Sequence, residues 1–114
     1  YQLVLDAQLA ALEAIRPGVM SGEVDRIARQ IITDAGYGEC FGHGLGHSVG
    51  IDIHESPRFN PSFDSTPMVE NMVMTVEPGI YIPDWGGIRI EDLVVVKSEG
   101  CEILSKTSKK LLEI

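Results

Sequence analysis

The 114-residue sequence is poor in cysteine, aromatic residues and basic residues, and it contains no long apolar run. Its two cysteines, Cys40 and Cys101, lack metal-type spacing; without secretory features we expect reduced thiols, with a single disulfide as the alternative. Nine basic and seventeen acidic residues give a net charge of −8, which argues against nucleic acid or an anionic membrane as a partner. No apolar stretch approaches the roughly 20 residues of a membrane span, and no signal-peptide pattern occurs, so a cytoplasmic location is predicted.

The remaining composition is that of an ordinary soluble globular protein, with 44% hydrophobic and 23% charged residues. A chain of 114 residues fits a single domain with a modest core. The sequence starts with Tyr1 rather than Met, at the beginning of a predicted helix. We therefore expect residues 1–114 to be part of something longer.

Two amphipathic helices are predicted in the first third of the chain. Leucines recur at helical spacing within residues 3–15, and Pro17 and Gly18 end this helix. Ser21 is the expected N-cap of a second helix, and Gly36 suits the position just after its last turn. Both helices are expected to be packing elements rather than binding sites.

The second half of the chain is predicted to form strands. Apolar and β-branched residues indicate strands at residues 72–77, 80–82, 88–97 and 101–104. Residues 56–69 contain three prolines and are expected to be a loop, which could shape the rim of a pocket. Two helices followed by several strands predict an α+β fold, with the helices on one face of a mainly antiparallel sheet.

The three histidines of the protein all fall between residues 41 and 55, in the sequence FGHGLGHSVGIDIHE. Its glycines disfavour a helix, at roughly 1 kcal/mol each relative to alanine, so this is not the helical two-histidine zinc motif. Glycine lets the backbone approach a ligand closely, so the imidazoles could bind a metal or a substrate; structural histidines are the alternative. His47 and His54 are seven residues apart, and both can face one site only if the strand breaks near residues 48–50.

Two glutamates, Glu77 and Glu91, lie within predicted apolar strands that are expected to be largely buried. A buried carboxylate must be protonated, paired with a cation or bound to a metal. One interpretation is a buried pair between Glu91 and Arg89, which share a strand face, with Glu77 exposed at an edge. The other is that both glutamates and one or more histidines bind a divalent ion, of which Mn²⁺, Co²⁺ and Fe²⁺ suit the donors and Zn²⁺ is also compatible.

Three linked segments carry a resemblance to a known family: GHGLGHSVGIDIHE (42–55), TVEPGIY (75–81) and GGIRIED (86–92). In this order and spacing they resemble the pita-bread-fold metallopeptidases, the family of methionine aminopeptidase, aminopeptidase P and prolidase. The resemblance covers essentially the whole chain. It implies that residues 1–114 are the C-terminal half of such a catalytic domain, with two helices packed on a curved, mainly antiparallel sheet.

The resemblance also implies a centre of two divalent ions, Mn²⁺ or Co²⁺ first and Zn²⁺ or Fe²⁺ next, which activates a bridging water. His47, Glu77 and Glu91 match its ligands, with Glu91 bridging both ions and Glu77 also transferring protons. His54 matches a catalytic histidine that contacts the scissile peptide and stabilises the tetrahedral intermediate.

The remaining matches concern substrate binding. His43 matches a histidine that lines the pocket together with His54. Arg89 matches an arginine of the proline-specific members and would join an active-site hydrogen-bond network with Tyr81. This arginine and the HGLGHSVGIDIHE pattern are similar to aminopeptidase P and prolidase rather than methionine aminopeptidase.

The resemblance therefore implies hydrolysis of Xaa-Pro bonds in a small peptide substrate, with dipeptidase and aminopeptidase both open. Methionine aminopeptidase-like activity is an alternative. Another is a noncatalytic peptide- or protein-binding module, although such modules typically lose the metal ligands that this chain keeps.

The sequence departs from the family pattern in two ways. Asn71 stands where the family usually has glycine, and asparagine tolerates the left-handed backbone expected there. The two aspartate ligands of the family lie upstream of the first helix, and Asp6, Asp25 and Asp34 match neither. Residues 1–114 alone are therefore expected to bind metal weakly, to be inactive and to self-associate through an exposed apolar face, whereas the whole protein is expected to be a homo-oligomer.

Overall fold

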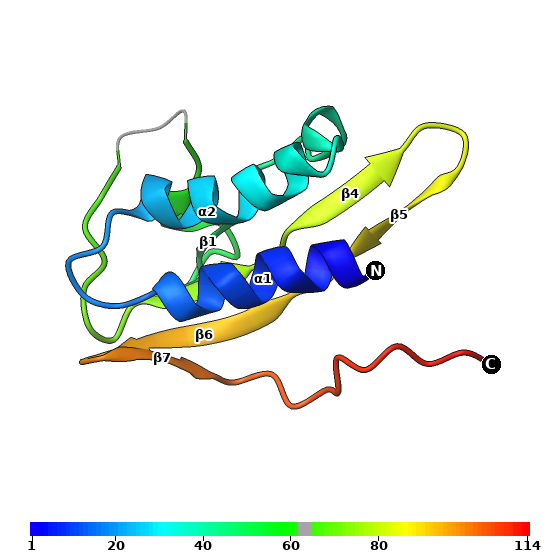
Figure 1. Ribbon diagram of the computed structural model, residues 1–114. Helices are drawn as coiled ribbons and strands as arrows, with labels where there is room; N and C mark the ends of the chain where they lie inside the picture. The colour runs from blue at the N-terminus through cyan, green and yellow to red at the C-terminus, as the bar shows by residue number, and fades with distance from the viewer. Residues whose placement is uncertain (62–64) are drawn as a thin grey trace.

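The computed structural model of the protein describes residues 1–61 and 65–114 (Figure 1). Within these ranges the helices are α1 (Gln2–Ala14), α2 (Ser21–Asp34) and the short 3₁₀ helix η1 (Gly38–Cys40). The strands are β1 (Gly46–Ser48), β2 (Glu55–Phe59), β3 (Val73–Val76), β4 (Gly79–Ile82), β5 (Gly86–Arg89), β6 (Asp92–Lys97) and β7 (Gly100–Ile103). The predicted α+β class is confirmed.

The strands form a larger sheet of order β2-β1-β3-β6-β7 and a two-stranded ladder of β4 with β5. Every paired neighbour runs antiparallel. The two long helices cross one face of the larger sheet, and the β4–β5 ladder projects beyond it (Figure 1). The core lies between these layers and is built from fully buried side chains of both helices and of β2, β3 and β6, including Val4, Ile32, Phe59, Met74 and Val94.

Of the two predicted ends of α2, only the N-terminal end differs from the prediction. Ser21 is the first residue of the helix rather than its cap, and Met20 takes the capping position without a side-chain hydrogen bond. The Ser21 hydroxyl instead accepts a hydrogen bond from the amide of Thr66 at 3.1 Å, because tertiary pairing with that segment takes the place of capping. At the other end Gly36 has φ +87°, as predicted for the residue that ends the helix.

The single strand predicted over residues 88–97 is wrong: it is two strands, β5 and β6, interrupted at Ile90 and Glu91. Val76 pairs with Asp92 and Gly79 pairs with Arg89, so β3–β4 and β5–β6 keep one register as a single long hairpin. In this register Pro78 stands opposite Ile90 and Glu77 stands opposite Glu91. The ladder is interrupted because Pro78 has no N–H to donate to Ile90, and only the Ile90 amide bonds back to the Pro78 carbonyl, at 3.3 Å.

The loop predicted over residues 56–69 is partly wrong, and residues 62–64 of it lie outside the described part. Glu55–Phe59 form β2, which pairs with β1. Phe59 is fully buried in the core, so its packing holds a proline-containing segment at the edge of the sheet. The left-handed turn expected at Asn71 is confirmed, with φ 72°.

Both cysteines are free thiols, as predicted. Among the described residues no helix is long and apolar enough to cross a membrane. After β7 the chain leaves the sheet and runs back toward the end of the molecule that holds the N-terminus (Figure 1). There the Tyr1 hydroxyl donates to the Lys109 carbonyl at 2.8 Å, which ties the two ends of the described chain together.

Candidate functional site

The short strand β1 brings His47 against β3 because its neighbour is a glycine. A Cβ at Gly46 would overlap the backbone carbonyl of Thr75, so only glycine permits this approach. The His47 amide then donates to the Thr75 hydroxyl at 3.0 Å. The register of β1 against β2 shifts between His47 and Ser48, which is the break predicted from the histidine spacing.

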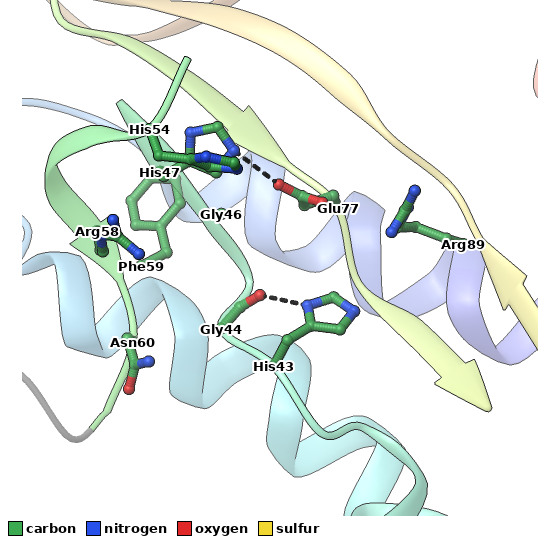
Figure 2. Close-up of a pocket in the computed structure, with 10 residues that line it drawn as sticks. All are labelled: His43, Gly44, Gly46, His47, His54, Arg58, Phe59, Asn60, Glu77 and Arg89. Carbon is green, nitrogen blue, oxygen red and sulfur yellow. Dashed lines mark hydrogen bonds and ion pairs between the residues drawn. The ribbon is translucent and has the colours of Figure 1, made fainter. Parts of the chain in front are cut away.

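This break brings His47 and His54 together. Their ring centroids lie 4.4 Å apart with an edge-on arrangement, so the two histidines face one site as the broken strand requires. Figure 2 shows both rings beside the Glu77 carboxylate, which comes from the link between β3 and β4. The prediction that the strand breaks near residues 48–50 is therefore confirmed.

The hydrogen bonds of His47 determine what its second nitrogen can do. The Ser48 carbonyl can only accept, so His47 Nδ1, 3.0 Å away, carries a proton and donates it. His47 Nε2 lies 3.2 Å from Glu77 Oε1, which also accepts from the Thr75 hydroxyl at 2.9 Å. A neutral imidazole would aim a lone pair at this carboxylate, so the arrangement calls for a proton or a metal ion between them.

The donors fit a divalent ion. A metal-binding histidine commonly donates its other N–H to a backbone carbonyl, as His47 does. Two donors about 2.1 Å from one ion at right angles lie about 3 Å apart, close to the separation of His47 and Glu77. Glu91 stands opposite Glu77 across the hairpin, where two like charges are unfavourable unless a cation offsets them. Glu77, Glu91 and His47 also line one common hollow of about 450 Å³.

Glu91 nevertheless differs from its prediction. Its side chain is 45% exposed rather than buried, and it forms an ion pair with Arg89 at 3.8 Å, whose own side chain is 52% exposed. The prediction of a buried Arg89–Glu91 pair is therefore wrong, as is that of an edge-exposed Glu77, which is 14% exposed. Within residues 1–61 and 65–114 no three His, Cys, Asp or Glu side chains converge closely enough to hold a metal by themselves.

A second group of polar side chains starts at His43. Its Nδ1 donates to the Gly44 carbonyl at 2.7 Å, so in the neutral ring Nε2 accepts from the Tyr81 hydroxyl 2.8 Å away. A hydrogen-bonding interaction with Tyr81 is the first cause of a raised pKa of Arg89. The charge of Tyr81 follows as a cause, and Glu77 and Glu91 raise the pKa further. The active-site network expected for Arg89 and Tyr81 stays a prediction.

Helix α2 fixes the loop that carries His43. The Asp25 carboxylate is fully buried and accepts two hydrogen bonds from Arg29, at 2.8 and 3.0 Å, and one from the Leu45 amide at 2.9 Å. Arg29 in turn donates to the carbonyls of Phe41 at 2.9 Å and His43 at 2.7 Å. The loop between η1 and β1 is therefore held by a charged pair on α2.

The histidines line a cavity of about 350 Å³ together with Glu77 and Arg89. Figure 2 shows these side chains converging from the His43 loop, β1, the β1–β2 loop and the two sides of the long hairpin. The cavity is completed by Arg58, Phe59 and Asn60, which sequence reasoning missed. Arg58 and Phe59 belong to β2, within the segment that was interpreted as a loop at a pocket rim, but no pattern singled out these residues.

The fold and the site define a metallopeptidase domain of the pita-bread type. Residues 1–98 match the profile of metallopeptidase family M24, and the chain belongs to this family. Membership of a metallopeptidase family implies divalent metal ions at the site.

Several relatives are similar over nearly the whole chain. The Xaa-Pro dipeptidase of Pyrococcus furiosus is 52% identical over 112 residues, which span 98% of this chain and 32% of that protein. The crystal structure of the prolidase from Pyrococcus horikoshii OT3 superimposes with a TM-score of 0.95 at 49% identity, covering 98% of this chain and 32% of that one. The X-Pro aminopeptidase from Thermotoga maritima MSB8 gives a TM-score of 0.91 at 46% identity, covering 96% and 31%. The chain thus spans about a third of the length of these relatives.

Proposed function

We propose that the protein hydrolyses Xaa-Pro peptide bonds with the aid of two divalent metal ions. The observation that carries the proposal is the His47 imidazole, which is held in one tautomer with Nε2 directed at the Glu77 carboxylate. This pair lies in the wall of a cavity that His43, His54 and Arg89 also line. The relatives named as Xaa-Pro dipeptidase, prolidase and X-Pro aminopeptidase support the choice of substrate.

The metal ligands of this chain are, in this proposal, His47, Glu77 and Glu91. Two further aspartates complete the centre from the part of the domain that residues 1–114 do not include, which makes this chain the C-terminal part of the catalytic domain. The ions, Mn²⁺ or Co²⁺ in the first instance and Zn²⁺ or Fe²⁺ in the second, supply a water of lowered pKa and polarise the scissile carbonyl. Glu91 must turn from Arg89 toward Glu77 to take part.

The other residues act on the substrate. His54 is exposed beside His47 and donates a hydrogen bond to the oxygen that becomes negative in the transition state. Glu77 takes a proton during attack and returns it to the departing amine. His43, Tyr81 and Arg89 form one hydrogen-bonded wall that orients a peptide with proline after the scissile bond.

The test uses the protein at its full natural length, with Mn²⁺ or Co²⁺, on Xaa-Pro dipeptides, longer Xaa-Pro peptides and matched Xaa-Ala peptides. We expect cleavage of the proline substrates only, and a loss of about 10²- to 10⁴-fold in kcat for Glu77→Gln. Glu70→Gln, an exposed glutamate in the turn before β3, is the matched control and should keep full activity. Elemental analysis should find two divalent ions per chain.

Other results would contradict the proposal. Equal cleavage of Xaa-Ala peptides would exclude proline specificity, and cleavage confined to N-terminal methionine would favour a methionine aminopeptidase. Peptide binding without metal and without turnover would indicate a noncatalytic module. Residues 1–114 expressed alone should bind Mn²⁺ weakly and show no turnover, and measurable cleavage by this shorter chain would refute the need for further ligands.

A further inference from the structure

A buried glutamine in α1 contacts the backbone immediately before both glutamates of the site. Gln8 is fully buried and its amide nitrogen lies 3.2 Å from the Val76 carbonyl and 3.3 Å from the Ile90 carbonyl. Val76 precedes Glu77, and Ile90 precedes Glu91. One side chain therefore reaches both strands of the long hairpin at the place where its ladder is interrupted.

The contact with Ile90 has a specific cause. In a regular antiparallel ladder the Ile90 carbonyl would accept from the residue opposite, which is Pro78, and proline has no N–H. Gln8 supplies the missing donor to this carbonyl. A leucine or methionine at position 8 would leave it buried without that donor, which is unfavourable in an interior.

The orientation of the Gln8 amide is fixed by its partners. Backbone carbonyls can only accept, so the NH₂ group faces them, and it also lies 3.3 Å from Asp92 Oδ2. Lys109 can only donate, and its ammonium group contacts Gln8 Oε1 at 3.1 Å and Asp92 Oδ2 at 2.6 Å. Asp92 is almost fully buried, at 2% exposure. A reversed amide would place Oε1 against these acceptors and Nε2 against Lys109, so only one orientation of the amide is favourable.

We propose that Gln8 is a positioning residue that sets the spacing of the Glu77 and Glu91 carboxylates. It holds the two strands one residue before each carboxylate, on the side of the hairpin that faces α1. The glutamates project from the same interruption toward the hollow that they share with His47. The inference deepens the proposed function and rests on it for the statement that these carboxylates bind metal.

The test compares Gln8→Met, which keeps the length and removes the donors, with two controls in the protein at its full natural length. Gln30→Met makes the same change at an exposed glutamine of α2. Ile32→Val removes a buried methylene from α2 and so lowers the stability of the protein at a site away from the hairpin. If Gln8→Met does not fold, Gln8→Asn takes its place, since it keeps an amide but withdraws it by one methylene.

Three measurements separate positioning from general destabilisation. In the metal-free protein, the Glu77 and Ile90 amides, which bond to Leu45 and Pro78 carbonyls, should exchange with solvent faster in Gln8→Met than in either control. Calorimetry with Mn²⁺ should show binding weakened about 10- to 100-fold, as is usual when a partner behind the ligands is lost. The visible spectrum of the Co²⁺ form should change in Gln8→Met and stay unchanged in Gln30→Met and Ile32→Val.

Unchanged amide exchange, or faster exchange with unchanged Mn²⁺ affinity and Co²⁺ spectrum, would overturn the inference while the proposed function stands. Absence of Mn²⁺ binding by the unmodified protein, with no effect of Glu77→Gln or Glu91→Gln, would overturn the proposed function and with it the role of Gln8 at a metal site. The exchange measurement would then still decide whether Gln8 holds the two strands.

Discussion

Replacing Arg29 with methionine should destabilise the protein through the charge that it leaves behind. Arg29 donates two hydrogen bonds to the Asp25 carboxylate, which has no exposed surface, and its guanidinium also lies 4.2 Å from the centre of the Phe41 ring. After Arg29→Met, Asp25 would keep the Leu45 amide as its remaining donor among those described here. The carbonyls of Phe41 and His43 would lose a donor at the same time.

The expected loss of unfolding free energy follows from the burial of the Asp25–Arg29 pair. Removing one partner of a buried ion pair costs about 3–5 kcal/mol. The Arg29 side chain is 26% exposed and Asp25 is 0% exposed, so water already solvates part of the pair and the lower end, about 3 kcal/mol, applies. With a urea m-value of about 1–3 kcal/mol per molar, the unfolding midpoint should fall by about 1–3 M.

Two further variants decide whether the charge is the cause. Arg26→Met makes the same substitution one turn away at an exposed position of α2 and should change stability by less than about 0.5 kcal/mol. The double variant Asp25→Asn/Arg29→Met no longer buries a lone charge and should be more stable than Arg29→Met. A loss below about 1 kcal/mol for Arg29→Met, or a double variant that is less stable still, would refute the reasoning.

Three other measurements probe the remaining contacts. Gly46→Ala should prevent the close approach of β1 to Thr75 and lower the unfolding midpoint sharply, whereas Gly42→Ala, where an added Cβ meets no atom within 4 Å, should be tolerated. Burial and then the charge of Asp92 raise the pKa of Cys101 above the ordinary 9.0, so the folded state holds the thiol proton more tightly than the unfolded state. Its contribution is complete below that value and lost as pH rises through the raised pKa, so the unfolding free energy should fall more steeply above pH 9 in the unmodified protein than in Cys101→Val. Trp85 is 78% exposed, and residues 1–114 alone should show concentration-dependent light scattering that Trp85→Ser reduces; identical curves would argue against an apolar contact there.

The sequence predicted what depends on local chemistry. Glycines at residues 42–50 argued against a helix, and the spacing of His47 and His54 required a break that the register shift in β1 provides. Asparagine at position 71 implied a left-handed turn, and its φ is 72°. These features depend on one residue and its immediate neighbours, so a single sequence is sufficient to find them.

What the sequence could not predict depends on partners far along the chain. The pattern of residues 88–97 is continuous, and the strand breaks because the residue opposite Ile90 is Pro78. Gln8 contacts residues 68 and 82 positions away, and helical spacing places it on the buried face of α1 without indicating which groups it bonds. The same holds for Arg29, whose carbonyl partners belong to a loop outside its helix. The side-chain roles at the metal site stay predictions.

The interruption of the long hairpin has a mechanical consequence. Only the short links between β3 and β4 and between β5 and β6 join the outer ladder to the main sheet, and each link contains one of the two glutamates. The outer ladder also packs on the rest of the domain through Ile80, which is buried in the core, and through the Tyr81–His43 hydrogen bond. These contacts therefore help to set the separation of Glu77 and Glu91. The single tryptophan of the protein, Trp85, lies in the turn at the far end of the ladder, so its fluorescence anisotropy reports how firmly the ladder is held.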